Sequence, residues 1–207
     1  MDEAAALARS LAGAVRDERV LAAIAAVPRH PFVPQSLRDR AYEDVALPID
    51  CEQTISQPLV VARMLALLQL RGDERVLDVG TGSGWHAALL GWLSREVWTV
   101  ERHLALSAAA AAALAQVGAA NVTCVIGDGC DGLPEQAPFD AINVAAAAED
   151  DLPATLARRL APGGRLVAPV GHADRQHLVL ARRTRGGIAT RRLDPVRFVP
   201  LLRGIAE

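Results

Sequence analysis

The sequence contains no lysine. All 22 basic residues of the 207-residue chain are arginine, so no lysine is present to act as a nucleophile or to form a Schiff base. Only three cysteines occur, none in a Cys-x-x-Cys pair, which argues against a disulfide framework and fits a reducing compartment. The five histidines share no metal-ligand spacing, and we therefore expect no metal site.

The sequence also lacks the features of a membrane anchor or a secretion signal. No basic segment precedes the alanines at the N-terminus, and the apolar runs are too short to cross a bilayer. The net charge of −2 provides no overall basic field that would attract a nucleic acid. We expect a cytoplasmic monomer with no nucleic-acid partner and no membrane partner, folded as one domain over residues 1–207.

The first 71 residues differ in pattern from the rest of the chain. Residues 2–27 predict two short helices separated near Gly13, and 59–70 predict an amphipathic helix. Between them, the segment 46–58 has no clear periodicity. We interpret residues 1–71 as a helical N-terminal extension that carries a substrate loop.

Residues 72–207 show a regular alternation of strand-like and helix-like segments. This alternation is typical of a doubly wound, mostly parallel, Rossmann-like α/β sheet. Strand-like runs near 177–181 and 196–200, joined by a loop rich in arginine and glycine, predict an antiparallel C-terminal hairpin at the sheet edge. The other expected strands are 75–79, 96–100, 122–126, 139–144 and 165–170, and the expected helices are 85–94, 104–117 and 152–160.

The most informative stretch runs from Val76 to Gly84, where an apolar strand meets three alternating glycines and the start of a helix. Such a turn lets the backbone approach a ligand closely. The spacing is G-x-G-x-G, and the last glycine of a dinucleotide fingerprint would fall on Trp85 or Ala87. Glu101 ends the next strand, about 20 residues after Gly80, where a carboxylate meets ribose hydroxyls. The pattern favours S-adenosylmethionine over NAD, although a tight turn beside an ordinary surface glutamate would use the same residues.

Ligands of open α/β sheets bind at the carboxyl ends of the strands, so the residues that follow each strand are candidates. Asp128 lies between two glycines and is placed to accept a hydrogen bond from an adenine amine, although Gly-Asp-Gly alone is usually only a turn. Asp78 is expected to support the glycine loop rather than to react. The predicted cofactor-binding residues are Asp78, Gly80, Thr81, Gly82, Ser83, Gly84, Glu101, Arg102, Asp128 and Gly129.

Several segments together resemble the protein-L-isoaspartate O-methyltransferase family over roughly residues 25–204. The glycine motif is shared by many methyltransferases, whereas Gln53-Thr54-Ile55-Ser56 is specific to this family. The other matching segments are Arg29…Phe32-Val33-Pro34, Ala41-Tyr42-Glu43-Asp44, Leu47-Pro48-Ile49, Gly127-Asp128-Gly129, Pro138 to Ile142, Pro162 to Leu166 and Arg197 to Leu201.

The resemblance implies transfer of a methyl group from S-adenosylmethionine to the free α-carboxylate of an L-isoaspartyl residue in a damaged protein. The ester then closes to a succinimide, which can reopen as normal aspartate. In this interpretation Ser56 is the catalytic residue, and isoaspartyl-containing proteins and peptides are the partners. The substrate-binding residues that the resemblance implies are Thr54, Ile55, Ser56, Ala146, Val199 and Leu201.

Ser56 has a second interpretation, because it precedes Gln57-Pro58 and an amphipathic helix. It could cap the N-terminus of that helix, with proline in the first turn. From the local pattern alone both roles remain open, and one does not exclude the other.

The chain departs from the family pattern at three places. Glu52 stands where glycine is usual before Gln53, and Leu59 stands where an aromatic residue or histidine often follows. Glu149-Asp150-Asp151 replaces a common proline after the alanine run 145–148. The added acidic residues are expected to lie near the site and to weaken the binding of an anionic substrate.

Two other functions are compatible with these residues. The chain could be a paralogue that methylates an aspartate in one dedicated peptide, although such family members usually carry an extra C-terminal domain. It could also be a non-catalytic module that binds S-adenosylmethionine, its chemistry lost through the change at Glu52. The intact Ser56 and the intact glycine loop argue against the second alternative.

Overall fold

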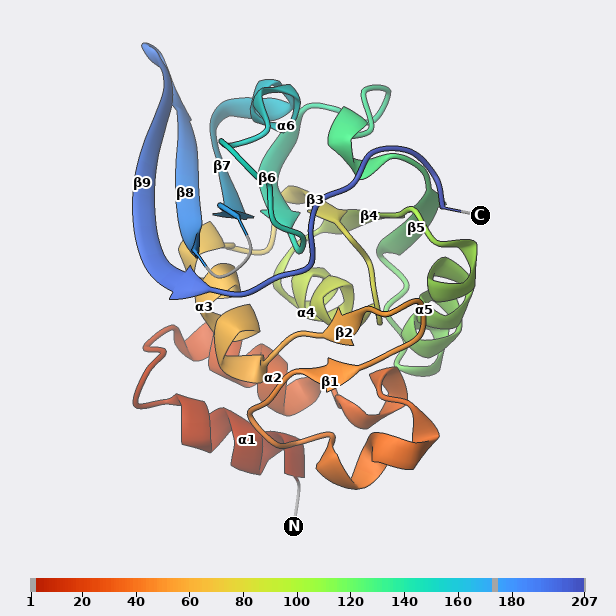
Figure 1. Cartoon of the computed structure of the whole chain (residues 1–207). Helices are drawn as coiled ribbons and strands as arrows, with labels where there is room; N and C mark the ends of the chain where they lie inside the picture. The colour runs from red at the N-terminus through yellow and green to blue at the C-terminus, as the bar shows by residue number, and fades with distance from the viewer. Residues whose placement is uncertain (1–2, 173–174, 207) are drawn as a thin grey trace.

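A computed structural model describes residues 3–172 and 175–206, and its centre is a seven-stranded, mostly parallel sheet in the order β5-β4-β3-β6-β7-β8-β9 (Figure 1). The order confirms the predicted doubly wound α/β sheet, with β8 and β9 antiparallel at one edge. Among the described residues, no helix combines the length and the apolar character that a membrane span requires.

The strands are β1 (Leu47–Pro48), β2 (Thr54–Ile55), β3 (Arg75–Val79), β4 (Glu96–Glu101), β5 (Val122–Ile126), β6 (Phe139–Val144), β7 (Leu160–Val170), β8 (Gln176–Thr184) and β9 (Gly187–Val196). The α-helices are α1 (Glu3–Leu11), α2 (Glu18–Ala26), α3 (Pro58–Leu68), α4 (Trp85–Leu93), α5 (Leu104–Gln116) and α6 (Ala154–Arg158), and the 3-10 helices are η1 (His30–Phe32), η2 (Gln35–Arg40) and η3 (Gly129–Asp131).

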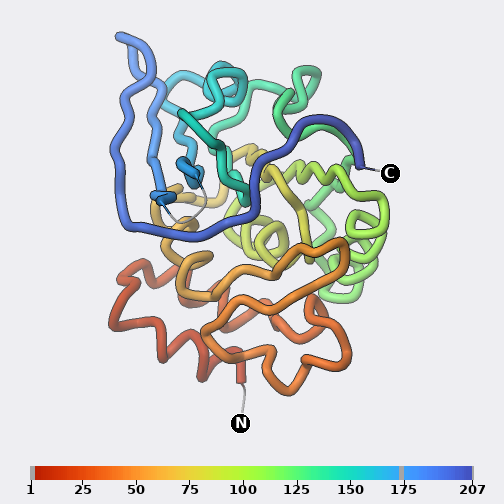
Figure 2. Tube along the Cα trace, viewed as in Figure 1, coloured from red at the N-terminus to blue at the C-terminus, as the bar shows by residue number. Residues whose placement is uncertain are grey.

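Side chains on the two faces of the sheet enter two separate hydrophobic clusters. Val76 belongs to the cluster that includes residues of the N-terminal helices, α3 and α4, whereas the next residue, Leu77, belongs to the cluster on the opposite face, which includes Leu156 of α6. This alternation follows from the period of two in a strand. The N-terminal helices contribute to the first cluster by packing on α3 and α4, and these two helices lie between them and the sheet (Figures 1 and 2).

Two parts of the predicted secondary structure are corrected. The second strand of the hairpin is β9 at Gly187–Val196, and the predicted strand 196–200 is instead an irregular segment with one isolated bridge at Pro200. The turn between β8 and β9 is only Arg185-Gly186. In addition, 46–58 is not wholly irregular, because β1 and β2 pair as a small antiparallel sheet.

The order of the strands determines where a ligand can bind. From β3 the chain runs outward to β4 and β5, and it then returns to β6 on the other side of β3. A crevice forms at such a reversal, at the carboxyl ends of the strands. The turns after β3 and β6 therefore face each other there, and Gly80 lies beside Ala145.

Candidate active site

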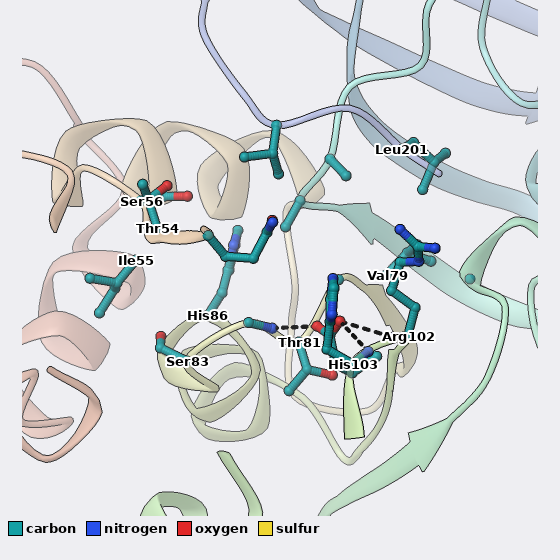
Figure 3. Close-up of a pocket in the computed structure, with 18 of the residues that line it drawn as sticks. Thr54, Ile55, Ser56, Val79, Thr81, Ser83, His86, Arg102, His103 and Leu201 are labelled. Carbon is teal, nitrogen blue, oxygen red and sulfur yellow. Dashed lines mark hydrogen bonds between the residues drawn. The ribbon is translucent and has the colours of Figure 1, made fainter. Parts of the chain in front are cut away.

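A cavity of about 340 Å³ lies at this crevice, a size suited to a small ligand. It is bounded by the glycine loop, by the end of β4, by the segment that carries Ser56 and by the C-terminal segment 199–202 (Figure 3). The predicted site residues that line it are Thr54, Ile55, Ser56, Gly80, Thr81, Gly82, Ser83, Glu101, Arg102, Gly129, Ala146, Val199 and Leu201.

Three predicted cofactor residues do not line the cavity. Asp78 is fully buried beneath the glycine loop, and Gly84 is the N-cap of α4. A Cβ on Gly84 would lie 3.1 Å from Cβ of Ala110 in α5, and its φ of +91° also favours glycine. The absence of a side chain at Gly84 therefore allows α4 to pack closely on α5.

Asp128 does not line the cavity, and both of its carboxylate oxygens accept hydrogen bonds from backbone amides. One accepts a hydrogen bond from the Cys130 amide at 2.8 Å, and the other accepts one from the Gly204 amide at 2.8 Å. Burial raises the Asp128 pKa, but these hydrogen bonds outweigh it and leave the pKa below its usual range. In this structure Asp128 anchors the C-terminal segment, and its expected contact with adenine stays a prediction.

Glu101 connects the end of β4 to the glycine loop. Its Oε2 accepts a hydrogen bond from the Gly82 amide at 2.8 Å, and its Oε1 accepts bonds from the amides of Arg102 and His103 at 2.9 and 3.1 Å. The carboxylate is thereby fixed in orientation at the cavity wall. A carboxylate in this position beside a glycine turn can accept hydrogen bonds from ribose hydroxyls. This fixed hydrogen-bond acceptor beside the glycine turn therefore fits an adenosine-bearing ligand.

The C-terminal segment 199–206 crosses the carboxyl ends of the central strands (Figures 1 and 2). It is held by hydrogen bonds between Ala147 and both Val199 and Leu201, at 2.7 and 2.8 Å, and by the Ala206 amide to the Arg102 carbonyl at 2.9 Å. Val199 and Leu201 thereby line the cavity next to Ala146, and their contact with the substrate stays a prediction.

Ser56 lies at the cavity wall, and its hydroxyl forms no hydrogen bond among the described residues. The helix that follows begins at Pro58, and its N-cap is Gln57, without a side-chain cap. Instead, Asp44 accepts hydrogen bonds from the Leu59 amide at 2.8 Å and from the Gln57 side chain at 3.0 Å. The N-cap interpretation of Ser56 is therefore wrong, because the distant Asp44 supplies the cap.

Arg29 holds the Ser56 segment in place from beneath. Its buried guanidinium donates to the carbonyl oxygens of Ala41, Val45 and Ser56, at 2.7, 3.1 and 3.1 Å. It also lies 5.2 Å from the ring centroid of Trp85 in α4, within the range of a cation–π interaction. Burial lowers the pKa of Arg29 to about 10, and the charge of Asp44 opposes this effect. One side chain therefore connects the Ser56 segment to the helix that follows the glycine loop.

We expect Arg29→Met to lower the free energy of unfolding by about 2–3 kcal/mol, because buried carbonyl groups lose their donors. Urea unfolding measures the effect. Arg63→Met is the matched control, since Arg63 forms only an exposed ion pair with Asp194 at 3.2 Å, and such pairs contribute at most about 1 kcal/mol. Equal effects of the two substitutions would contradict the assignment of Arg29.

Asp78 and His86 belong to a cluster of buried polar side chains beneath the glycine loop. The Asp78 carboxylate accepts hydrogen bonds from Thr99 Oγ1 at 2.8 Å and from Asn143 Nδ2 at 2.7 Å. Burial raises the pKa of Asp78 to about 6 despite these two bonds, and burial lowers the pKa of His86 to about 3. The sequence did not indicate a role for either Asn143 or His86: Asn143 reaches Asp78 because β6 pairs with β3, and His86 comes from the first turn of α4.

These opposite shifts predict how stability depends on pH. The pKa of Asp78 is raised by folding, so its contribution to stability is full below its ordinary 3.8 and is lost as pH rises through about 6. The pKa of His86 is lowered by folding, so its contribution is full above 6.5 and is lost as pH falls through about 3. Between about pH 4 and 6, therefore, the contribution of Asp78 to the unfolding free energy falls as pH rises, whereas the contribution of His86 increases.

Asp78→Asn removes the part of the pH dependence of stability that comes from Asp78. Relative to the unsubstituted protein, we expect the unfolding free energy of the variant to rise by roughly 2 kcal/mol from about pH 4 to about pH 6.5. Urea unfolding across this range provides the measurement. A difference between the two proteins that stays constant with pH would mean that Asp78 titrates normally.

The three departures from the family pattern have different surroundings. Glu52 lines the cavity and has a φ of +58°, a backbone conformation that favours glycine. The stretch 149–151 does not line the cavity, and Asp150 forms an exposed ion pair with His172 at 3.0 Å. Leu59 packs against the hydrophobic core. The expectation that both acidic features lie at the site is therefore wrong for 149–151 and correct for Glu52.

Within the described part of the chain, no group of three or more histidine, cysteine, aspartate or glutamate side chains could hold a metal ion.

Comparison with known proteins gives a consistent result. The family model described as Protein-L-isoaspartate(D-aspartate) O-methyltransferase (PCMT) matches residues 4–206. A protein-L-isoaspartate O-methyltransferase of Roseiflexus castenholzii is 52% identical over 192 residues, which cover 93% of this chain and 88% of the relative. One of Koribacter versatilis is 49% identical over 188 residues, which cover 91% of this chain and 84% of the relative.

Solved structures with the same family name share the fold of this chain. A putative Plasmodium falciparum protein-L-isoaspartate O-methyltransferase, crystallised with S-adenosyl-L-homocysteine, superposes with a TM-score of 0.84. The two chains are 25% identical, and the superposition covers 96% of this chain and 98% of the other. A second structure of that name gives a TM-score of 0.83 at 28% identity, covering 97% of this chain and 65% of the other.

Proposed function

This chain belongs to the protein-L-isoaspartate O-methyltransferase family. We propose that it methylates isoaspartyl residues, and that one half of its cavity binds the cofactor while the other half binds the substrate. The chain is a methyltransferase dependent on S-adenosylmethionine, and the family acts on isoaspartyl-containing proteins. The observation that supports the proposed roles is that the glycine loop and Ser56 line the same cavity.

The glycine loop and Glu101 form the half of the cavity proposed for the cofactor. Gly80 permits close approach of the backbone to a ligand, and Glu101 offers a fixed carboxylate to the ribose. When bound, the cofactor supplies a methyl group on a positively charged sulfur. The part of the protein is to hold the acceptor in line with that methyl and to keep water away.

The Ser56 segment forms the half proposed for the substrate. A substrate carboxylate, with an ordinary pKa of about 4, is already ionised at neutral pH and needs no general base. The free hydroxyl of Ser56 can donate one hydrogen bond to a carboxylate oxygen without adding a charge that competes with it. Thr54 and Ile55 shape the same segment, and Val199 and Leu201 cover the opening. The adjacent backbone nitrogen of the substrate can then attack the ester and expel methanol to form a succinimide, which water can reopen as aspartate. Methylation is thus the first stage of repair.

The assay compares two peptides that differ only in an isoaspartyl or an aspartyl linkage, incubated with S-adenosylmethionine labelled in the methyl group. We expect base-labile methyl ester on the isoaspartyl peptide and none on its isomer. Equal labelling of both, or of neither, would count against the proposed substrate. A paralogue acting on one dedicated peptide would label neither peptide, and no feature of the cavity favours that alternative. We further propose a monomeric, single-domain cytoplasmic enzyme, which sedimentation and fractionation would test.

Glu52 is expected to weaken substrate binding, because its negative charge lies at the cavity wall. Glu52→Gly should lower the KM for an isoaspartyl peptide several-fold, since it removes both the charge and the strained φ. Glu52→Gln isolates the charge. Cys51→Gly isolates the backbone effect, because Cys51 has a similar φ of +56° and does not line the cavity. An unchanged KM in Glu52→Gln and Glu52→Gly would show that the carboxylate does not act on the substrate.

A further inference from the structure

A chain of buried hydrogen bonds runs beneath the glycine loop and ends at His86. Thr81 Oγ1 lies 2.7 Å from Thr99 Oγ1, which lies 2.8 Å from Oδ2 of Asp78. On the other side of the carboxylate, Asn143 Nδ2 lies 2.7 Å from Asp78 Oδ1 and 3.3 Å from His86 Nδ1. His86 is in the first turn of α4 and is 8% exposed.

The carboxylate sets the direction of every hydrogen bond in this chain. An ionised carboxylate only accepts, so Asn143 must present its amide nitrogen to Asp78. The second hydrogen of that nitrogen then points to Nδ1 of His86, which must accept it. A neutral imidazole with Nδ1 as acceptor carries its proton on Nε2. The tautomer of His86 is thus fixed by its neighbours.

The Nε2–H donor of His86 has no partner among the described residues, although the atom is buried. An unpaired buried donor is costly and rare in a folded protein. His86 also lines the cavity together with Ser56 and Gly80, and in Figure 3 its ring points from α4 toward the segment of Thr54 and Ser56. A ligand atom in the cavity is the natural acceptor for this hydrogen.

We propose that His86 Nε2–H, at the N-terminus of α4, donates a hydrogen bond to a carboxylate bound in the cavity. The inference rests on the proposed function, because both molecules that function brings here carry a carboxylate. The end of the helix supports an anionic ligand, since the first turn of a helix carries partial positive charge. The acceptor is the carboxylate of the methionine part of the cofactor or that of the isoaspartyl residue.

Two substitutions and two measurements test this donor. His86→Met removes it at similar size, and His86→Gln keeps an amide donor. Calorimetry gives the Kd of S-adenosylhomocysteine, and the methylation assay gives the KM of the isoaspartyl peptide. We expect a 10- to 100-fold increase with His86→Met, typical of a lost hydrogen bond to a charged group, and at least partial recovery with His86→Gln. His177→Met is the control, because His177 is on β8, outside the cavity.

The two possible carboxylates give different results. An increase in the Kd of S-adenosylhomocysteine identifies the cofactor, whereas an increase in KM alone identifies the substrate. If both constants stay within twofold in a folded His86→Met variant, the proposal is wrong. If the unsubstituted protein does not methylate the isoaspartyl peptide, the proposed function is wrong. The Kd of S-adenosylhomocysteine would still show whether His86 binds the carboxylate of the cofactor.

A nitrogen NMR spectrum of the imidazoles tests the tautomer without any assay. We expect one histidine, identified by its absence in His86→Gln, to be the neutral Nε2–H form in the free protein. Its Nε2 signal should shift when S-adenosylhomocysteine or the peptide is added. A proton on Nδ1 would overturn the proposal, even if His86→Met failed to fold.

Discussion

Glu101→Ala is expected to raise the Kd of S-adenosylhomocysteine by about 10³-fold. The substitution removes a carboxylate that would bind two ribose hydroxyls, and each hydrogen bond to a charged group is worth about 2 kcal/mol. It also frees the Gly82 amide, which the carboxylate holds at 2.8 Å, so the glycine loop loses an anchor. Isothermal calorimetry measures the change directly.

The same strand provides a matched control. Glu96 lies at the opposite end of β4 and forms a half-exposed ion pair with Arg75 at 2.9 Å. Glu96→Ala should leave the Kd of S-adenosylhomocysteine unchanged, because this pair is far from the cavity. A Glu101→Ala variant that binds within threefold of the unsubstituted protein would show that the ribose is held elsewhere.

Ser56→Ala should lower kcat by about 10²- to 10³-fold and leave the Kd of S-adenosylhomocysteine within a few-fold. Removing one donor that orients a reacting group typically has an effect of this size. The fold should be retained, because the Ser56 hydroxyl forms no hydrogen bond among the described residues and its carbonyl still accepts from Arg29.

Ser10→Ala is the control for this substitution, since the Ser10 hydroxyl bonds only the Leu7 carbonyl within α1. Steady-state kinetics with the isoaspartyl peptide and calorimetry with S-adenosylhomocysteine separate the two constants. A parallel loss of turnover and cofactor binding in Ser56→Ala would contradict a role confined to the substrate carboxylate.

The features that the sequence predicts well are local. Strands β3, β4, β5 and β6 occur where apolar runs predicted them, and the glycine turn follows β3 directly. Glu101 could be identified because the spacing between consecutive strands is itself a local property. The cavity-lining residues after these strands follow from the same rule.

The strand β9 was missed because it has no hydrophobic face. Nearly all of its side chains are exposed, with Arg191 and Arg192 among them, and it exists through its pairing with β8. An edge strand of this kind gives no period-two signal. The apolar run at 196–200 gave the stronger pattern and drew the prediction to the wrong segment.

Contacts between segments that are distant in the sequence could not be predicted from it either. Asp44 caps α3 from 15 positions away along the chain, and Asn143 meets Asp78 only because β6 pairs with β3. Arg29 was noticed only as part of a family motif, and its burial under Ser56 required the folded chain. Polar residues of this kind give no periodic signal in a sequence.

The guanidinium of Arg29 spans the two halves of the cavity, since it contacts the Ser56 carbonyl on one side and Trp85, next to the glycine loop, on the other. Nucleotide bound to the loop will therefore stiffen the peptide-binding half in advance, which lowers the entropy that a peptide must lose. The two ligands should bind synergistically, and linkage requires each to tighten the other by the same factor.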